Sequence, residues 1–129
     1  MEVKITERGW AGHSICADSC KFRRNTLIEY EDKHWIVSTV GALVVNIGNG
    51  KSKIDTIGSG NRYYETMAWK AKFDGTYWDV NIDNPIHFDS DWAVNKCEFA
   101  SDQLANDMHE TVVKELSEKI QEVNNDNKS

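Results

Sequence analysis

The spacing of apolar residues changes once along this chain, and the change restricts the fold more than any other feature. In the first hundred residues, apolar positions alternate with polar ones or form short runs rich in Ile, Val, Thr and Trp, a pattern typical of β-strands. From Leu104 to Ile120 they recur every four residues, as in an amphipathic helix. The pattern predicts an α+β fold, a twisted antiparallel sheet packed against one C-terminal helix.

Turn residues divide the β-region into predicted strands. The clearest hairpin joins Arg62–Phe73 to Thr76–Ile82, because the intervening Asp-Gly pair suits a two-residue type I′ turn. In this hairpin Trp69 and Trp78 are expected to touch across the strands. Gly41 is expected to permit a bend. The other predicted strands are Met1–Glu7, Thr26–Tyr30, His34–Val40, Ala42–Ile47, Ile54–Ile57 and Ile86–Phe88. The polar turn Glu31-Asp32-Lys33 is expected to join the second and third of these strands into a hairpin.

The helix is predicted over Asp102–Val123, with Ser101 as its N-cap. The polar segment Asn124–Ser129 is expected to be a disordered tail. At 129 residues the chain has the length of one domain, so residues 1–123 are expected to fold as a single unit. No apolar run approaches the roughly 18 residues that span a bilayer, and Met1–Ile5 lacks the apolar core of a signal peptide, which favours an intracellular protein without membrane contact.

Charge is distributed unevenly between the two parts of the chain. Residues 1–72 hold eleven Lys or Arg against eight Asp or Glu, whereas residues 73–129 hold four against thirteen. Carboxylates that avoid the apolar stripe of the helix can imitate nucleic-acid phosphates toward a basic partner, although such a face is often merely solvated. The residues predicted to bind the partner are Asp79, Asp83, Asp89, Asp91, Asp102, Asp107, Glu110, Glu115 and Glu118.

A second hypothesis places a phosphorylated nucleotide, such as a defence signal, on a basic and aromatic cluster. Guanidinium groups beside aromatic rings suit a phosphate and a base together. The candidate ligand-binding residues are Lys21, Arg23, Arg24, Arg62, Tyr63 and Tyr64. The alternative is a solvated edge whose arginines pair with Glu29, Glu31 or Glu65.

The segment Glu7–Thr26 also raises the question of a metal or a nucleophile. His13, Cys16 and Cys20 offer zinc-type ligands that Cys97 or His109 would have to complete, but the spacing matches no usual zinc pattern. The segment is instead expected to be a turn that leaves Lys21, Arg23 and Arg24 outside. No catalytic motif is present, so we expect neither an enzyme nor a cofactor.

The segments ITERGWAGH, FRRNTLIEY, VSTVG and RYYETMAWKAKFDGTYWD carry a family resemblance. Together they resemble a group of small proteins carried by bacterial phages and prophages, over about Ile5 to Val113. The usual GHFICA of this group stands here as GHSICA, with Ser14 in place of a bulky apolar residue. The resemblance carries over no catalytic residue.

The resemblance implies a biological context. Small acidic phage proteins are often inhibitors of bacterial defence, anti-CRISPR proteins among them. The chain is therefore expected to be a non-catalytic inhibitor in the cytoplasm of an infected bacterium. Its expected partner is a nucleic-acid-binding effector, which it binds through the acidic surface. Direct contact with nucleic acid is not expected. The inhibitor could act as a monomer or as a homodimer.

Overall fold

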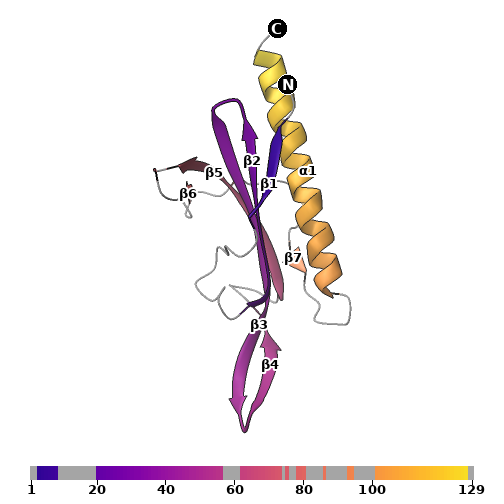
Figure 1. Ribbon diagram of the computed structural model, residues 1–129. Helices are drawn as coiled ribbons and strands as arrows, with labels where there is room; N and C mark the ends of the chain where they lie inside the picture. The colour runs from indigo at the N-terminus through magenta and orange to yellow at the C-terminus, as the bar shows by residue number, and fades with distance from the viewer. Residues whose placement is uncertain are drawn as a thin grey trace.

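The computed structural model describes residues 3–8, 20–56, 62–73, 75, 78–80, 86, 93–94 and 101–127. The protein has an α+β fold in which one long C-terminal helix packs on an antiparallel sheet, as predicted (Figure 1). The strands are β1 (Lys4–Glu7), β2 (Cys20–Tyr30), β3 (Lys33–Gly48), β4 (Lys51–Asp55), β5 (Tyr64–Phe73), β6 (Trp78–Val80) and β7 (Ala93–Val94), and the helix is α1 (Ser101–Asn127).

The sheet is organised around β3. Its path runs β1-β2-β3-β5-β6, with β4 added to β3 and β7 added to β5. The β2–β3 hairpin closes on the pair Tyr30↔Lys33, so its turn consists of Glu31 and Asp32, and Glu31 has a positive φ of 57°. This hairpin confirms the sequence prediction, with Lys33 in the strand rather than in the turn.

Strand β3 runs without interruption through the position where a bend was expected. Gly41 pairs with Phe22 on one side and Tyr64 on the other, so the predicted break between two strands is wrong. The unusual backbone belongs instead to Ala42, whose φ is 56°. Beyond this point β3 leaves β5 and pairs with β4, and the β3–β4 hairpin extends past the N-terminal end of α1 (Figure 1).

The predicted β5–β6 hairpin is present but has a longer connection than expected. Phe73 pairs with Trp78, so four residues separate the strands and the two-residue Asp-Gly turn is wrong. As a consequence the ring of Trp78 lies against Phe73, with centroids 5.1 Å apart, and against His34 at 4.5 Å. The expected contact between Trp69 and Trp78 is replaced by these two.

Helix α1 lies across one face of the sheet and forms the main hydrophobic core with it (Figure 1). Burial of a large apolar side chain contributes about 1.5–3 kcal/mol, so the buried apolar residues of α1 supply most of the free energy that holds the helix on the sheet. The buried members of this core are Ile28, Tyr30, Trp35, Val37, Ala68, Val112, Val113, Leu116 and Ile120.

Two apolar residues near the ends of the predicted helix lie outside the buried stripe. Leu104 is 48% exposed and Val123 is 57% exposed, so neither belongs to the buried face. The helix also continues to Asn127, four residues beyond its predicted end, and most of the expected tail is therefore helical. In the described part of the chain, no helix has the length and apolar character required to cross a membrane.

Candidate functional site

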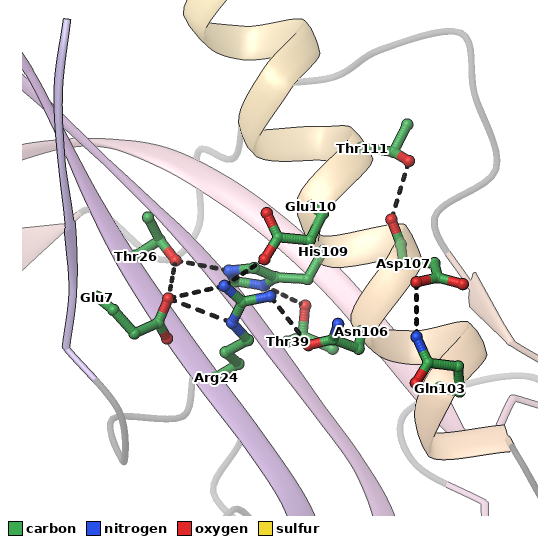
Figure 2. Close-up of polar contacts among 10 residues, drawn as sticks. All are labelled: Glu7, Arg24, Thr26, Thr39, Gln103, Asn106, Asp107, His109, Glu110 and Thr111. Atoms are coloured by element: carbon green, nitrogen blue, oxygen red, sulfur yellow. Dashed lines mark hydrogen bonds and ion pairs between the residues drawn. The ribbon is translucent and has the colours of Figure 1, made fainter.

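The helix–sheet interface contains a buried polar cluster that interrupts the apolar core. His109 occupies a core position of α1 and has no exposed surface. Figure 2 shows its ring directed at the sheet, where Nε2 lies 2.7 Å from Thr26 Oγ1 and Nδ1 lies 2.7 Å from Thr39 Oγ1. Thr39 Oγ1 is in turn 2.6 Å from Thr66 Oγ1. The threonines come from the three adjacent strands β2, β3 and β5, so the histidine ties the helix to the centre of the sheet.

The hydrogen-bond pattern determines the tautomer of His109. A carboxylate accepts only, so Thr26 must donate its single proton to Glu7 Oε2, which lies 2.9 Å away. Thr26 then accepts from His109, which requires a proton on Nε2. Nδ1 is left as an acceptor for the hydroxyl of Thr39, and Thr39 accepts from Thr66. In this neutral state Thr26 and Thr39 each donate once and accept once, and Thr66 donates to Thr39.

Burial strongly favours the neutral ring. Loss of solvation, assisted by the positive charge of Arg24, lowers the pKa of His109 to about 4, and the negative charges of Glu7 and Glu110 only partly oppose this. The ring is therefore uncharged at neutral pH. Its role in the described structure is to hold α1 at one position on the sheet.

Arg24 connects the cluster to the surface. Its guanidinium group donates to Glu7 at 3.0 Å, pairs with Glu110 at 2.6 Å and donates to Asn106 at 3.0 Å (Figure 2). The side chain of Arg24 is only 22% exposed, so the prediction that it would stay outside is wrong. From Cys20 onward, the segment that was expected to be a turn forms the first half of β2. Side chains alternate between the two faces of this strand, and the side chain of Arg24 lies on the face that α1 covers.

The bridge also determines the state of Glu7. Partial burial alone would raise the pKa of this carboxyl, but hydrogen bonds from Arg24 and Thr26 outweigh burial, and the pKa lies below its ordinary value. Glu7 thus stays ionised and keeps Thr26 in the donor state that fixes the His109 tautomer. Because β1 supplies Glu7, this edge strand is attached to α1 through Arg24.

A buried hydroxyl elsewhere on α1 provides a first stability test. Among the described side chains, Ser117 Oγ is buried without a hydrogen-bond partner. Ser117→Ala removes an unsatisfied polar atom and improves helix propensity, so we expect the free energy of unfolding to rise by about 1 kcal/mol. The matched control is Thr39→Val, which removes a hydroxyl with two partners and should lower stability by about 1–3 kcal/mol. Urea denaturation measures both, and a loss of stability in Ser117→Ala would show that its hydroxyl is satisfied.

The outer face of α1 carries the acidic residues that the sequence singled out. The exposed ones are Asp102, Asp107, Glu110 and Glu118, with Glu122 one turn further on, while Glu115 is half-buried. Some of them have internal partners: Tyr64 donates to Asp102, Gln103 donates to Asp107 at 2.9 Å, and Glu110 pairs with Arg24. The C-terminal half of the helix therefore holds the acidic groups with most freedom to meet a partner.

The remaining predicted acidic residues are not joined to this face by the described structure. Asp79 lies in β6, paired with Lys72 of β5, and its side chain lies outside the described residues. Asp83, Asp89 and Asp91 also lie outside them.

The residues of the predicted nucleotide site are distributed over separate contacts. Arg24 belongs to the buried bridge, whereas Arg62 donates to Glu65 at 2.7 Å, as the ion-pair alternative expected. Tyr64 is 3% exposed beneath the start of α1. Lys21 is exposed, and Arg23 and Tyr63 are half-buried. Neighbours along β2 point to opposite faces of the sheet, so Arg23 and Arg24 do not share one.

Two of the candidate zinc ligands, Cys20 and His109, lie within the described residues. His13, Cys16 and Cys97 lie outside the described residues. Cys20 is buried at the start of β2 against Val40 and Leu43, and His109 is committed to threonine hydroxyls. Within the described ranges, no group of three or more His, Cys, Asp or Glu is arranged to hold a metal ion.

His109 was identified in the sequence only as a last zinc ligand. The sequence signal for a buried polar role is the position of His109 in the middle of the apolar stripe, four residues after Ala105 and four before Val113. Its threonine partners could not be inferred, since Thr26 and His109 are 83 positions apart.

Comparison with protein-family models, with curated proteins and with solved structures finds no match for this chain.

Proposed function

We propose that this protein acts by binding rather than by catalysis, and that the outer face of α1 is its contact surface for a basic partner. The observation that carries the proposal is the exposed acidic face of a helix whose position is fixed by the buried His109 cluster. Within α1, seven Asp or Glu stand against two Lys. A rigid acidic helix of this kind suits a cleft that normally holds nucleic-acid phosphates.

The proposed partner is a nucleic-acid-handling effector of a bacterial defence system. The resemblance to small phage and prophage proteins supports this choice, and an anti-CRISPR inhibitor in the cytoplasm of the infected host is its most specific form. Inhibition would consist of occupying the nucleic-acid channel, since the exposed carboxylates and the phosphates would compete for the same basic side chains. Affinity would come from apolar anchors at the contact, and the charges would accelerate encounter.

Charge reversal on the outer face tests this proposal. Glu118 and Glu122 are exposed, one helical turn apart. In Glu118→Lys/Glu122→Lys the steering field is inverted locally, so the association rate with a purified CRISPR effector complex should fall about tenfold at low salt. Surface interferometry over a salt series measures this rate, and competition with target DNA for the effector measures inhibition.

The control reverses the exposed Lys114, which lies on the same face between Glu110 and Glu118. Lys114→Glu is also a charge reversal on this face but makes the face more acidic, so association should be as fast or faster. Equal rates for the wild type and the double variant at low salt would contradict the proposed contact surface. Failure to compete with nucleic acid on any defence effector would contradict the proposed inhibitory role.

A further inference from the structure

The turn between β3 and β4 holds the only Asn-Gly pair in the sequence, Asn49-Gly50. The hairpin that carries this pair extends past the N-terminal end of α1, so the helix does not cover the turn (Figure 1). Every residue from Asn46 to Lys53 is exposed. Water therefore reaches the turn and the strand ends on both sides of it.

The backbone of this turn has the type I′ conformation. Gly48 pairs with Lys51, so the two central residues are Asn49, with a φ of 55°, and Gly50, with a φ of 71°. Positive φ at both central positions is what a type I′ turn requires. The amide of Gly50 is therefore not part of the β3–β4 ladder. A Cβ atom on Gly50 would meet nothing within 4 Å, so the space around this residue is open.

The side chain of Asn49 differs from the other asparagine side chains that the structure describes. Asn25 and Asn106 accept hydrogen bonds from arginine side chains, at 3.4 Å and 3.0 Å. Asn46, in the same hairpin as Asn49, accepts from a backbone amide at 2.9 Å and is followed by the β-branched Ile47. Within the described residues, no hydrogen bond holds the side chain of Asn49. Its amide group is therefore free to turn toward the backbone of the next residue.

Asparagine is chemically labile when the next backbone nitrogen can reach its side chain, and glycine at that position leaves the approach unhindered. Once hydroxide has removed the N–H proton of Gly50, the nitrogen attacks Cγ of Asn49. A C–N bond forms, and the side-chain nitrogen leaves as ammonia. Water then adds to one of the two carbonyl carbons of the five-membered succinimide and opens the ring to aspartate or isoaspartate. The net reaction consumes one water and releases one ammonia.

We propose that Asn49 is a site of spontaneous deamidation in the folded protein. The aspartate product keeps the turn, because Asp-Gly suits the same type I′ conformation. The isoaspartate product adds a methylene group to the backbone of a two-residue turn and would disrupt the closing pair of Gly48 and Lys51. Either product places a new carboxylate beside the exposed Lys51 and makes the net charge one unit more negative than -6. The inference does not depend on the function proposed for α1.

Incubation of the full chain in warm, mildly alkaline buffer tests the proposal. Trypsin cleaves after Lys33 and Lys51, which places Asn46 and Asn49 in one peptide, and fragment masses distinguish the two sites. We expect the amide-to-acid mass change at Asn49 while Asn46 stays intact, and a faster change at higher pH, because the attack requires loss of the Gly50 proton. The proposal is overturned if Asn49 is unchanged after the time in which a synthetic peptide of the same sequence is fully deamidated, or if Asn46 reacts equally fast.

The matched variants are Asn49→Gln and Asn46→Gln, which lengthen the two exposed asparagines of the hairpin by the same methylene group. A glutamine side chain would have to close a six-membered ring, which forms far more slowly. Asn49→Gln should therefore abolish the mass change in the tryptic peptide, whereas Asn46→Gln should leave its rate unchanged. A mass change that persists in Asn49→Gln would place the reaction at another residue and refute the assignment. Neither result affects the association of α1 with an effector, which is measured separately.

Discussion

Gly41→Ala is expected to destabilise the protein by about 3 kcal/mol or more, an effect at the upper end for a single added methyl group. A Cβ atom at this position would lie 2.3 Å from Cδ1 of Tyr64 and 2.6 Å from the carbonyl oxygen of Tyr63. Real contacts do not come this close, so one of the two neighbours has to move.

Neither neighbour can move without breaking a contact. The carbonyl of Tyr63 accepts the amide of Ala42 at 2.8 Å, at the point where β3 changes its partner from β5 to β4. The ring of Tyr64 packs against Phe22 with centroids 6.0 Å apart, and its hydroxyl donates to Asp102 at the start of α1. The added methyl group therefore displaces either the strand junction or the N-terminal attachment of the helix.

Gly48→Ala is the matched control, because it adds the same atom where nothing lies within 4 Å. Gly48 has a φ of 95°, so its substitution costs only the backbone strain of a side chain in a left-handed conformation, about 1–2 kcal/mol. Urea denaturation of both variants measures the difference. If Gly41→Ala costs no more than Gly48→Ala, the close packing of Tyr64 on Gly41 is incorrect.

The role of Gly41 illustrates what the sequence could and could not predict. The sequence shows a glycine between two apolar runs, and such a glycine often permits a bend, so a bend is what the local pattern predicts. The actual reason is steric and non-local, since Tyr64 follows Gly41 by more than twenty positions and pairs with it only once β5 joins the sheet. Local patterns indicate where a glycine interrupts a strand, but not what lies against it.

The elements themselves were more predictable than their connections. Alternation and the four-residue period are local properties, so they predicted the β2–β3 hairpin, the strand β5 and most of α1. The Asp-Gly pair led to an incorrect prediction of the β5–β6 turn, because the observed register places Phe73 opposite Trp78 and the loop is longer than two residues. Cross-strand aromatic packing is set by register, and a dipeptide preference does not determine it.

The candidate site was predictable only in its exposed part. Acidic residues that avoid the apolar stripe of a helix must face solvent, and the structure exposes Glu118 and Glu122 accordingly. The bridge formed by Glu7, Arg24 and Glu110 joins β1, β2 and α1, which requires the tertiary structure.

Acidification is expected to destabilise the protein through His109, well above the pH at which most carboxylates titrate. The pKa of His109 is lowered from 6.5 to about 4 in the folded state, chiefly because burial disfavours the charged ring. Between these two values the unfolded chain binds a proton that the folded protein does not. Stability is therefore complete above the unfolded pKa and is lost as the pH falls through this window.

The expected loss is large for one residue. Between about pH 7.5 and pH 4.5 the free energy of unfolding should fall by about 2–3 kcal/mol from His109 alone. Glu7 acts in the same direction but in a lower range, because its pKa lies below the ordinary 4.5 and its contribution disappears only in stronger acid. Urea denaturation at a series of pH values within this window thus isolates the histidine.

His109→Gln separates the titration from the structural role of the ring. The amide replaces the ring without a titrating proton, so the variant should lose about 1–3 kcal/mol at neutral pH through imperfect hydrogen bonds to Thr26 and Thr39. Its stability should then change little down to pH 4.5, because the group that distinguishes the two states is gone. The matched control His34→Gln removes an imidazole that lies 3.8 Å from Glu29, outside the buried cluster, and should keep the wild-type pH dependence. A His109→Gln variant that is as sensitive to acid as the wild type would show that the ring is not held neutral between helix and sheet, and the fixed position of the acidic helix would then need another cause.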